Sequence, residues 1–194
     1  MTNGQKIALK EGNLIYFQGF LSNTEAFDFL EFFKTTIPFQ QNEITIFGKT
    51  YKTPRLESFH AKNKNSYTYS GNQLQSKPFT EELHTLCHRI EKATNSVFNC
   101  VLINLYRDGQ DSNGWHADNE KELGPNPVIA SLNLGATRRF DLKHNQSQEK
   151  YCIELHAGDL LWMDNQIQNF YKHQIAKTKR VHEPRINLTF RMIQ

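Results

Sequence analysis

The second half of the chain is a succession of short β-strand patterns, and this feature limits the possible folds more than any other. Each run alternates polar and apolar residues or is apolar throughout, and turn residues such as Gly and Asn separate the runs. Two amphipathic helices are predicted upstream of them. Short strands that follow two helices predict an α+β protein, in which a double-sheet jelly roll carries the N-terminal helices on one side. The strand patterns cover residues 128–134, 137–143, 151–156 and 160–163.

Both helices have recognisable starts. Ser22-Asn23-Thr24-Glu25 has the spacing of a capping box, and Pro38 ends the helix that this box opens. The second helix begins at Lys77-Pro78-Phe79-Thr80 and repeats apolar residues at i, i+3, i+4 and i+7. Its apolar face consists of Leu83, Leu86, Cys87 and Ile90.

Composition favours one domain. A chain of 194 residues, 38% of them hydrophobic and 22% charged, fits a single domain over residues 1–194. Within it we expect residues 1–96 to hold the helices and a hairpin, and residues 97–194 to form the strand-rich core. The net charge of +3 permits a polyanionic partner without demanding one.

Cysteine use and the N-terminal residues indicate the compartment. The three cysteines, Cys87, Cys100 and Cys152, include no CxxC pair, which predicts neither a disulfide framework nor a zinc ribbon. Residues 1–10 lack the apolar run of a signal peptide, and no segment has the length needed to cross a bilayer. We therefore expect an intracellular protein without membrane association, in the cytoplasm or, in a eukaryote, the nucleus.

A hairpin is predicted before the second helix, with strands over residues 43–47 and 50–53 and a turn at Gly48-Lys49. Phe47 at its tip either packs within the hairpin or wedges between nucleic-acid bases. In the second interpretation nearby cations hold phosphate groups. These cations are Lys49, Lys52 and Arg55.

A further short strand follows at Ser66-Tyr67-Thr68-Tyr69-Ser70. Its alternation places Tyr67 and Tyr69 on one face. This pair either belongs to the core or forms a surface on which bases stack.

The sequence Trp115-His116-Ala117-Asp118 lies in a polar loop after the apolar strand 98–106. In an extended segment His116 and Asp118 point to the same side, so they offer an imidazole nitrogen and a carboxylate oxygen to one ion. A third ligand would complete a facial triad, which leaves sites on iron(II) open for oxygen and a cosubstrate. A His-x-Asp pair also occurs by chance as an ordinary hydrogen-bonded pair.

The pattern of the last strand favours the metal-binding interpretation of His116 and Asp118. From Arg185 to Met192 the residues alternate strictly, and the apolar face belongs in a core. The polar face is either solvated or forms a row of fixed donors suited to a small dicarboxylate such as 2-oxoglutarate. Asn104 and Tyr106 share a face of the strand 98–106, where the buried Asn either bonds to backbone or contacts the same ligand. The polar face consists of Arg185, Asn187, Thr189 and Arg191.

Four downstream histidines compete as the third ligand. We expect His144 to be solvated at a strand end and His156 to be structural. His173 follows an apolar segment and precedes the two arginines by one loop, so we expect it on a strand beside the last one. His173 is therefore our predicted ligand, with His182 as the alternative.

These motifs resemble the AlkB family of iron(II)- and 2-oxoglutarate-dependent nucleic-acid dealkylases, whose fold is a double-stranded β-helix, the jelly roll expected above. The match covers most of the chain after residue 43, and its hairpin is similar to that of the animal DNA-repair members. The most specific feature is the closing Arg-x-Asn-x-Thr-Phe-Arg together with the upstream His-x-Asp. The matching pieces are Phe47-Gly48-Lys49, Tyr67-Thr68-Tyr69-Ser70-Gly71, Leu102-Ile103-Asn104-Leu105-Tyr106-Arg107-Asp108-Gly109, Trp115-His116-Ala117-Asp118 and Pro184-Arg185-Ile186-Asn187-Leu188-Thr189-Phe190-Arg191.

The resemblance implies the cofactors and the reaction. It implies that His116, Asp118 and His173 form the catalytic iron(II) centre. It also implies oxidative demethylation of N-alkylated bases of the 1-methyladenine and 3-methylcytosine type, with oxygen and 2-oxoglutarate consumed and formaldehyde, succinate and carbon dioxide released. The residues implied to contact 2-oxoglutarate are Asn104, Tyr106, Arg185, Asn187, Thr189 and Arg191.

The resemblance also implies that the target base leaves the stack. Tyr69 and His116 would sandwich the flipped base, Phe47 would fill the gap, and Glu120 would meet the base edge. Asn119 stands where many repair members carry a second Asp, so this position lacks the negative charge that those members have there. The substrate-binding residues implied are Phe47, Lys49, Arg55, Tyr67, Tyr69, Asn119 and Glu120, and further candidate phosphate contacts are Arg138, Arg139, Lys172, Lys177, Lys179 and Arg180.

The expected partner is nucleic acid, alkylated DNA in the first instance, bound by a monomer. A related oxygenase acting on RNA or on a modified nucleotide is an alternative, because composition does not report contacts to the 2′-hydroxyl. A reader that binds damaged bases without turnover is a third hypothesis. The presence of metal ligands together with cosubstrate arginines disfavours it.

Overall fold

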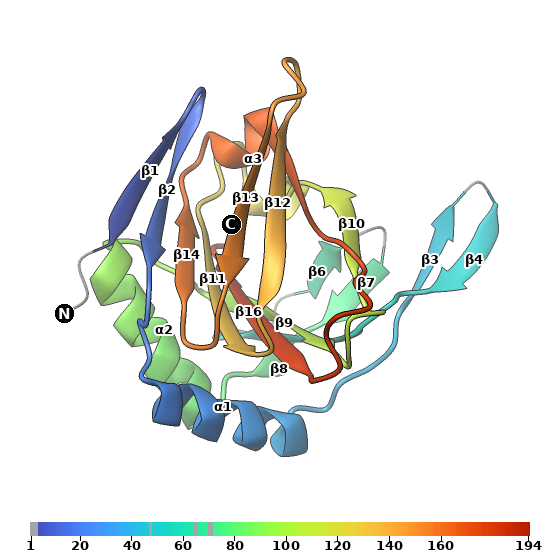
Figure 1. The fold of residues 1–194 in the computed structure, drawn as a ribbon. Helices are drawn as coiled ribbons and strands as arrows, with labels where there is room; N and C mark the ends of the chain where they lie inside the picture. Colours follow the sequence, from blue (N-terminus) through green and yellow to red (C-terminus); the bar gives the residue numbers. More distant parts are fainter. Residues whose placement is uncertain (1–3, 47, 64–65, 70–71) are drawn as a thin grey trace.

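Two packed β-sheets form the body of the protein in the computed structural model, which describes residues 4–46, 48–63, 66–69 and 72–194 (Figure 1). The larger sheet has eight strands, and all of its neighbours pair antiparallel except the last two, β5 and β8. In spatial order they are β1 (Gln5–Leu9), β2 (Gly12–Phe17), β14 (Leu160–Met163), β11 (Ile129–Gly135), β16 (Arg185–Arg191), β9 (Cys100–Tyr106), β5 (Leu56–Ala61) and β8 (Lys77–Pro78).

The smaller sheet has four antiparallel strands and faces the larger one. Two separate hairpins accompany the sheets, and the first projects from the body of the molecule (Figure 1). The smaller sheet consists of β10 (Asn113–His116), β15 (Tyr171–Ile175), β12 (Arg138–His144) and β13 (Lys150–Leu155); the hairpins are β3 (Glu43–Ile46) with β4 (Lys49–Lys52) and β6 (Ser66–Tyr69) with β7 (Asn72–Gln75).

Two long helices, α1 (Asn23–Thr36) and α2 (Glu81–Thr94), cover the outer face of the larger sheet. Ser22 caps α1 through the predicted capping box with Glu25, and the helix ends at Thr36, with Ile37 as its C-cap before Pro38. Thr80 caps α2 by accepting from the backbone of Leu83. The predicted apolar face of α2 is buried against the sheet. Short helices also lie at η1 (Lys121–Leu123) and α3 (Ile167–Phe170).

The alternation in β16 divides two hydrophobic cores. Ile186, Leu188 and Phe190 join the core between the larger sheet and the helices. The second core lies between the two sheets and includes Phe140 and Leu142. The polar residues of β16 face this inner side, where they too are buried. The two-layer jelly roll with helices on one side is therefore confirmed.

Several boundaries differ from the predictions. The strands β1 and β5 were not predicted. Lys49 begins β4 rather than completing the turn. Met192, expected on the apolar face of the last strand, follows the end of β16 and is 45% exposed. Among the helices that the structure describes, none has the length and apolar character needed to cross a bilayer.

Candidate metal centre and adjoining pocket

His116, Asp118 and His173 meet at one point. His116 ends β10, Asp118 lies two residues beyond it, and His173 lies on β15. The two histidines are direct partners in the β10–β15 ladder, so the strand pairing itself brings them together. One ligand atom from each of the three residues lies within 4.8 Å of the others.

The spacing of these atoms suits a shared ion. Nε2 of His116 lies 3.9 Å from Oδ1 of Asp118, and Nε2 of His173 lies 3.9 Å from Oδ2. Two atoms that each bond one transition-metal ion at about 2.1 Å are at most about 4.2 Å apart. Each histidine therefore has one oxygen of the Asp118 carboxylate within that limit. Two imidazoles with one carboxylate are the donor set of an iron(II) facial triad.

Hydrogen bonds orient His116 for this role. Its Nδ1 lies 2.7 Å from the carbonyl oxygen of Gly114, so Nδ1 carries the proton and donates it there. Nε2 is then an acceptor. It accepts a hydrogen bond of 3.1 Å from Nδ2 of Asn113. A bound metal ion would use the same lone pair of Nε2 and would therefore replace this donor.

Two buried residues hold Asp118. The backbone N–H of Asp118 donates to Oε1 of Gln168 on α3 at 2.9 Å, and Nη2 of Arg191 donates to Oδ1 at 2.8 Å. Gln168 is 1% exposed. Sequence reasoning missed Gln168, because no local pattern connects it to a residue fifty positions upstream.

The charge states also suit a divalent cation. Burial lowers the pKa of His116, and the guanidinium groups of Arg55 and Arg191 lower it further. Burial and the neighbouring His116 lower the pKa of His173 to about 3. Burial would raise the pKa of Asp118, yet Arg191 and the two histidines outweigh it and the pKa is lowered. At neutral pH the cluster therefore presents two neutral imidazoles and one carboxylate.

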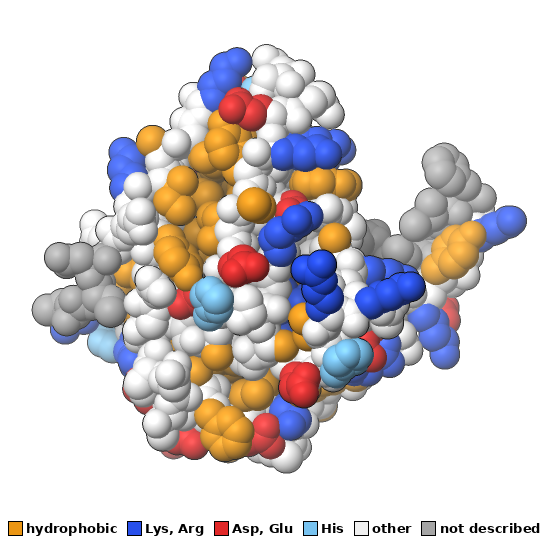
Figure 2. All heavy atoms as spheres, viewed as in Figure 1, with side chains coloured by type: hydrophobic (Ala, Val, Ile, Leu, Met, Phe, Trp, Pro, Cys, Tyr) orange, Lys and Arg blue, Asp and Glu red, His pale blue; other side chains and the backbone are white. Residues whose placement is uncertain are grey.

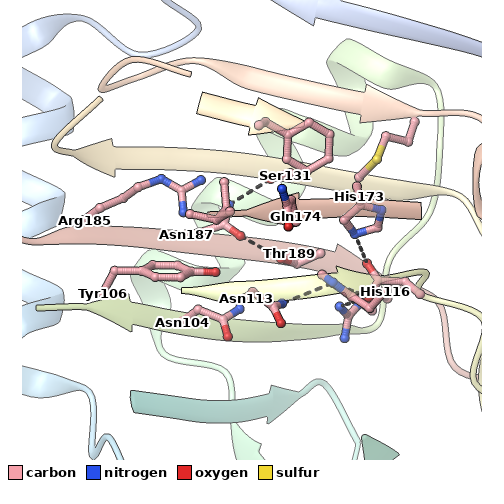
Figure 3. Close-up of a pocket in the computed structure, with 15 residues that line it drawn as sticks. Asn104, Tyr106, Asn113, His116, Ser131, His173, Gln174, Arg185, Asn187 and Thr189 are labelled. Atoms are coloured by element: carbon pink, nitrogen blue, oxygen red, sulfur yellow. Dashed lines mark hydrogen bonds and ion pairs between the residues drawn. The ribbon is translucent and has the colours of Figure 1, made fainter. Parts of the chain in front are cut away.

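A pocket between the two sheets extends from this cluster (Figure 3). His116 and His173 lie at one end and Arg185 at the other, with Asn187 and Thr189 between them (Figure 3). The pocket thus brings together every residue predicted to bind the metal or the cosubstrate. Its lining is Asn104, Tyr106, Asn113, His116, Asp118, Ser131, Phe140, Met163, His173, Gln174, Ile175, Arg185, Asn187, Thr189 and Arg191.

Arg185 is a buried cation with donors to spare. Its Nη2 donates to Oδ1 of Asn133, and its guanidinium carbon lies 5.1 Å from the centre of the Tyr106 ring. Nε and Nη1 are buried and have no hydrogen-bond partner among the described residues. Burial lowers the pKa of Arg185 to about 10, so the group is still charged at neutral pH. Charged donors left over in a buried site fit an anionic ligand.

The donors between the two ends of the pocket are fixed by their neighbours. Nδ2 of Asn187 donates to Oγ of Ser131 at 2.8 Å, and Oγ1 of Thr189 donates to Oδ1 of Asn187 at 3.1 Å. With Arg185 at one end and Arg191 beside Asp118 at the other, the pocket fits a dicarboxylate with one end at the metal centre.

Comparison with known proteins agrees with this geometry. Residues 13–191 match the 2OG-Fe(II) oxygenase superfamily. The chain belongs to this superfamily. Iron(II), 2-oxoglutarate and oxygen are the cofactors that membership implies, and the residues of the cluster and the pocket fit them.

Relatives of this oxygenase include AlkB homologues. It is 37% identical over 158 residues to DNA oxidative demethylase ALKBH2 from Bos taurus, covering 77% of this chain and 57% of that protein. It is 36% identical over 187 residues to alpha-ketoglutarate-dependent dioxygenase alkB homolog 3 from Homo sapiens, covering 91% of this chain and 65% of that protein. The oxygenase thus spans less than two thirds of these relatives. The predicted resemblance to the AlkB family is confirmed.

The fold has solved counterparts. The structure of OsALKBH1 superposes with a TM-score of 0.68 over 97% of this chain and 100% of that chain, at 18% sequence identity. A 2OG-Fe(II) oxygenase family protein from Burkholderia pseudomallei gives a TM-score of 0.60 over 92% of this chain and 84% of that chain, at 14% identity. These similarities support the jelly-roll fold of the oxygenase.

The third-ligand prediction needs two corrections. His173 lies on β15, between β10 and β12 of the smaller sheet, and not on a strand beside β16. His144, which we expected to be solvated, is fully buried, with Nε2 2.5 Å from a carboxylate oxygen of Glu11. His156 and His182 are exposed and lie outside the pocket lining.

Among the residues whose side chains the structure describes, those predicted to contact the substrate do not lie together in the pocket as the predicted metal and cosubstrate residues do. Phe47 lies outside the described residues, and for Tyr67 and Tyr69 the structure describes only the backbone of β6. Lys49 is exposed on β4. Asn119 is exposed and Glu120 is half-buried, and the two directly follow Asp118 in the sequence.

Two predicted phosphate contacts instead lie in the interior. Arg55 is 4% exposed, and its guanidinium donates to Asn104 and Glu57. Arg138 is 3% exposed and donates to three backbone carbonyl oxygens. Neither reaches the surface that a phosphate contact requires. Figure 2 shows other Lys and Arg side chains gathered on one face of the molecule, and the candidates that are exposed are Arg139, Lys172, Lys177, Lys179 and Arg180.

Proposed function

We propose that this oxygenase removes methyl groups oxidatively from N-alkylated bases in DNA, of the 1-methyladenine and 3-methylcytosine type. The observation that carries the proposal is one pocket that joins a His-Asp-His cluster to a row of buried polar side chains ending in Arg185, whose Nε and Nη1 have no hydrogen-bond partner among the described residues. The printed names of the relatives support DNA as the substrate class.

The residues divide the work between them. His116, Asp118 and His173 would hold iron(II), which when bound would allow oxygen to act as the oxidant. One atom of O2 would become the hydroxyl of the hydroxymethyl group, and the other would enter succinate as 2-oxoglutarate loses carbon dioxide. Arg185 and Arg191 would each take a carboxylate of 2-oxoglutarate. The hydroxymethyl group then leaves the base nitrogen as formaldehyde. The further cosubstrate contacts are Asn104, Tyr106, Asn187 and Thr189.

The substrate base must leave its stack to reach this pocket, because the pocket lies between the sheets. Extrusion costs a few kcal/mol and costs least for a damaged base, so selectivity begins before the reaction. Phe47, Lys49, Tyr67, Tyr69, Asn119 and Glu120 remain our candidates for contacts around the flipped base.

Formaldehyde release from oligonucleotides tests the proposal. Single-stranded and duplex DNA and RNA carrying 1-methyladenine or 3-methylcytosine would be incubated with and without iron(II) and 2-oxoglutarate. We expect the DNA substrates to give repaired base and formaldehyde, and to do so only when iron(II) and 2-oxoglutarate are both present. Repair confined to RNA would reassign the substrate, and binding of the damaged strands without consumption of 2-oxoglutarate would indicate a reader.

We further propose that residues 1–194 act as one domain and as a monomer. Strand β2 pairs with β14, and β5 pairs with β9, so residues before and after position 97 share one sheet. Light scattering on the eluting protein should give a mass near 22.7 kDa; twice that mass would contradict the monomer.

A further inference from the structure

Arg55 does not line the pocket, but it is hydrogen-bonded to a residue that does. It precedes β5, and its Nε donates to Oδ1 of Asn104 on β9 at 2.9 Å. Both residues are almost fully buried, with 4% and 3% of their surfaces exposed. Asn104 lines the pocket, whereas Arg55 does not. The bond therefore joins a buried cation to a side chain predicted to contact the cosubstrate.

This bond determines which way the Asn104 amide faces. An asparagine amide offers an acceptor oxygen on one side and an NH2 group with two donors on the other, whereas a guanidinium offers donors only. Oδ1 of Asn104 must therefore face Arg55, and Nδ2 must face away. The carboxylates of 2-oxoglutarate are acceptors only, so this orientation is the one that allows Asn104 to donate to them.

Arg55 is itself held in place. Its Nη2 donates to Oε1 of Glu57 at 2.6 Å, within a buried ion pair. Glu57 lies directly opposite Asn104 in the β5–β9 ladder, and its other oxygen accepts from Nδ2 of Asn42 at 2.8 Å. An ion pair buried in this way has little freedom to rearrange, because each charge loses its compensation if the other moves.

We propose that Arg55 and Glu57 are positioning residues for 2-oxoglutarate, which act by locking the Asn104 amide with its NH2 group toward the pocket. The inference rests on the proposed function and deepens it, since it concerns how the same site binds its cosubstrate. A purely structural pair would support the fold and leave the affinity for 2-oxoglutarate unchanged.

The first test removes both charges together. In the double variant Arg55→Met with Glu57→Gln no buried charge is left unpaired, so the fold is expected to persist. Titration calorimetry of 2-oxoglutarate into the manganese(II)-loaded protein, without nucleic acid, should give a dissociation constant about tenfold higher than wild type, the loss expected for one hydrogen bond. Manganese affinity should stay unchanged. Wild-type affinity for 2-oxoglutarate in a folded double variant would overturn the proposal.

A second variant tests the orientation itself. Asn104→Asp keeps the size of the side chain and gives Arg55 a stronger acceptor, but it presents no donor to the cosubstrate. We expect its thermal midpoint to match or exceed that of wild type, while its 2-oxoglutarate affinity falls further than in the double variant. Unchanged affinity would overturn the proposal even if the double variant failed to fold.

Two controls separate the possible outcomes. Arg55→Lys retains a cation that can donate to Asn104, so it should recover part of the lost affinity. The double variant Lys62→Met with Glu91→Gln removes an ion pair of 3.0 Å outside the pocket lining and should bind 2-oxoglutarate as wild type does. If the wild-type protein itself bound no 2-oxoglutarate, the proposed function would fail before the positioning role was reached.

Discussion

Nη2 of Arg191 donates to Oδ1 of Asp118 at 2.8 Å, although both residues are 2% exposed. This contact links the last residue of β16 in the larger sheet to the carboxylate of the His116-Asp118-His173 cluster. It also keeps Asp118 ionised against the effect of burial. A carboxylate bonded on one oxygen and charged at neutral pH is suited to give its other oxygen to a cation.

Asp118→Asn should abolish metal binding. The neutral amide keeps the shape of the side chain but loses the only anionic ligand of the cluster, so we expect manganese(II) affinity to fall by more than about 100-fold and demethylation to be undetectable. Electron paramagnetic resonance of manganese(II) measures the first effect. Retained binding would remove Asp118 from the ligand set, and His156→Gln, at an exposed histidine outside the pocket, is the matched control.

Arg185→Met should separate cosubstrate affinity from stability. Two buried donors of Arg185 have no partner among the described residues, so removing the charge should leave the thermal midpoint unchanged or higher. Loss of charge-assisted bonds to a carboxylate should cost about 3 kcal/mol, which raises the 2-oxoglutarate KM roughly 100-fold. An unchanged KM would argue against a dicarboxylate at this end of the pocket.

Gln168→Leu should lower the metal affinity indirectly, through the position of Asp118. Oε1 of Gln168 accepts the backbone N–H of Asp118, and removal of such an outer contact typically lowers metal affinity by about 10- to 100-fold. The stability should fall by about 1–3 kcal/mol, because a buried N–H loses its partner. Gln166 lies on the same segment, and its backbone N–H, not its side chain, donates to Asp164. Gln166→Leu should therefore bind metal normally; equal losses in both variants would point to a general effect on α3.

His60 should make the protein less stable in mild acid. Burial lowers its pKa and the Lys77 ammonium adds to the effect, against a backbone bond to Pro78 that raises it. The unfolded chain, with a pKa of about 6.5, takes up the proton first, so stability is present above pH 6.5 and declines as pH falls toward the lowered value. His60→Gln should flatten the urea-denaturation stability between about pH 7 and pH 5, and the exposed His182→Gln should not. Parallel curves for wild type and His60→Gln would exclude this contribution.

The sequence predicts best where one strand carries its own signal. The strict alternation from Arg185 to Arg191 identifies a buried apolar face and a polar face, and both predictions are confirmed by where those side chains lie. The capping box at Ser22 and the apolar face of α2 are equally local, and both are as predicted. Local periodicity is sufficient here because each element buries one face of its own.

Prediction failed where burial depends on a distant partner. Arg55 was predicted to contact phosphate, yet Asn104 and Glu57 hold it inside the protein. His144 is buried by its contact with Glu11, 133 positions upstream. The prediction that the strand of His173 lies beside the last strand was also wrong, since β15 pairs with β10 and β12. The path of the chain, and not proximity in sequence, determines which strands pair in a two-sheet fold.

The predicted metal ligands belong to the smaller sheet or follow directly from it, whereas Asn104, Arg185 and Arg191 belong to the larger one. Iron and 2-oxoglutarate bound together would therefore cross-link the two sheets, since separating the sheets would have to release both. A ligand present at 100 times its dissociation constant adds about 2.7 kcal/mol to the free energy of unfolding. The thermal midpoint of this oxygenase should therefore rise with the concentrations of free iron and 2-oxoglutarate.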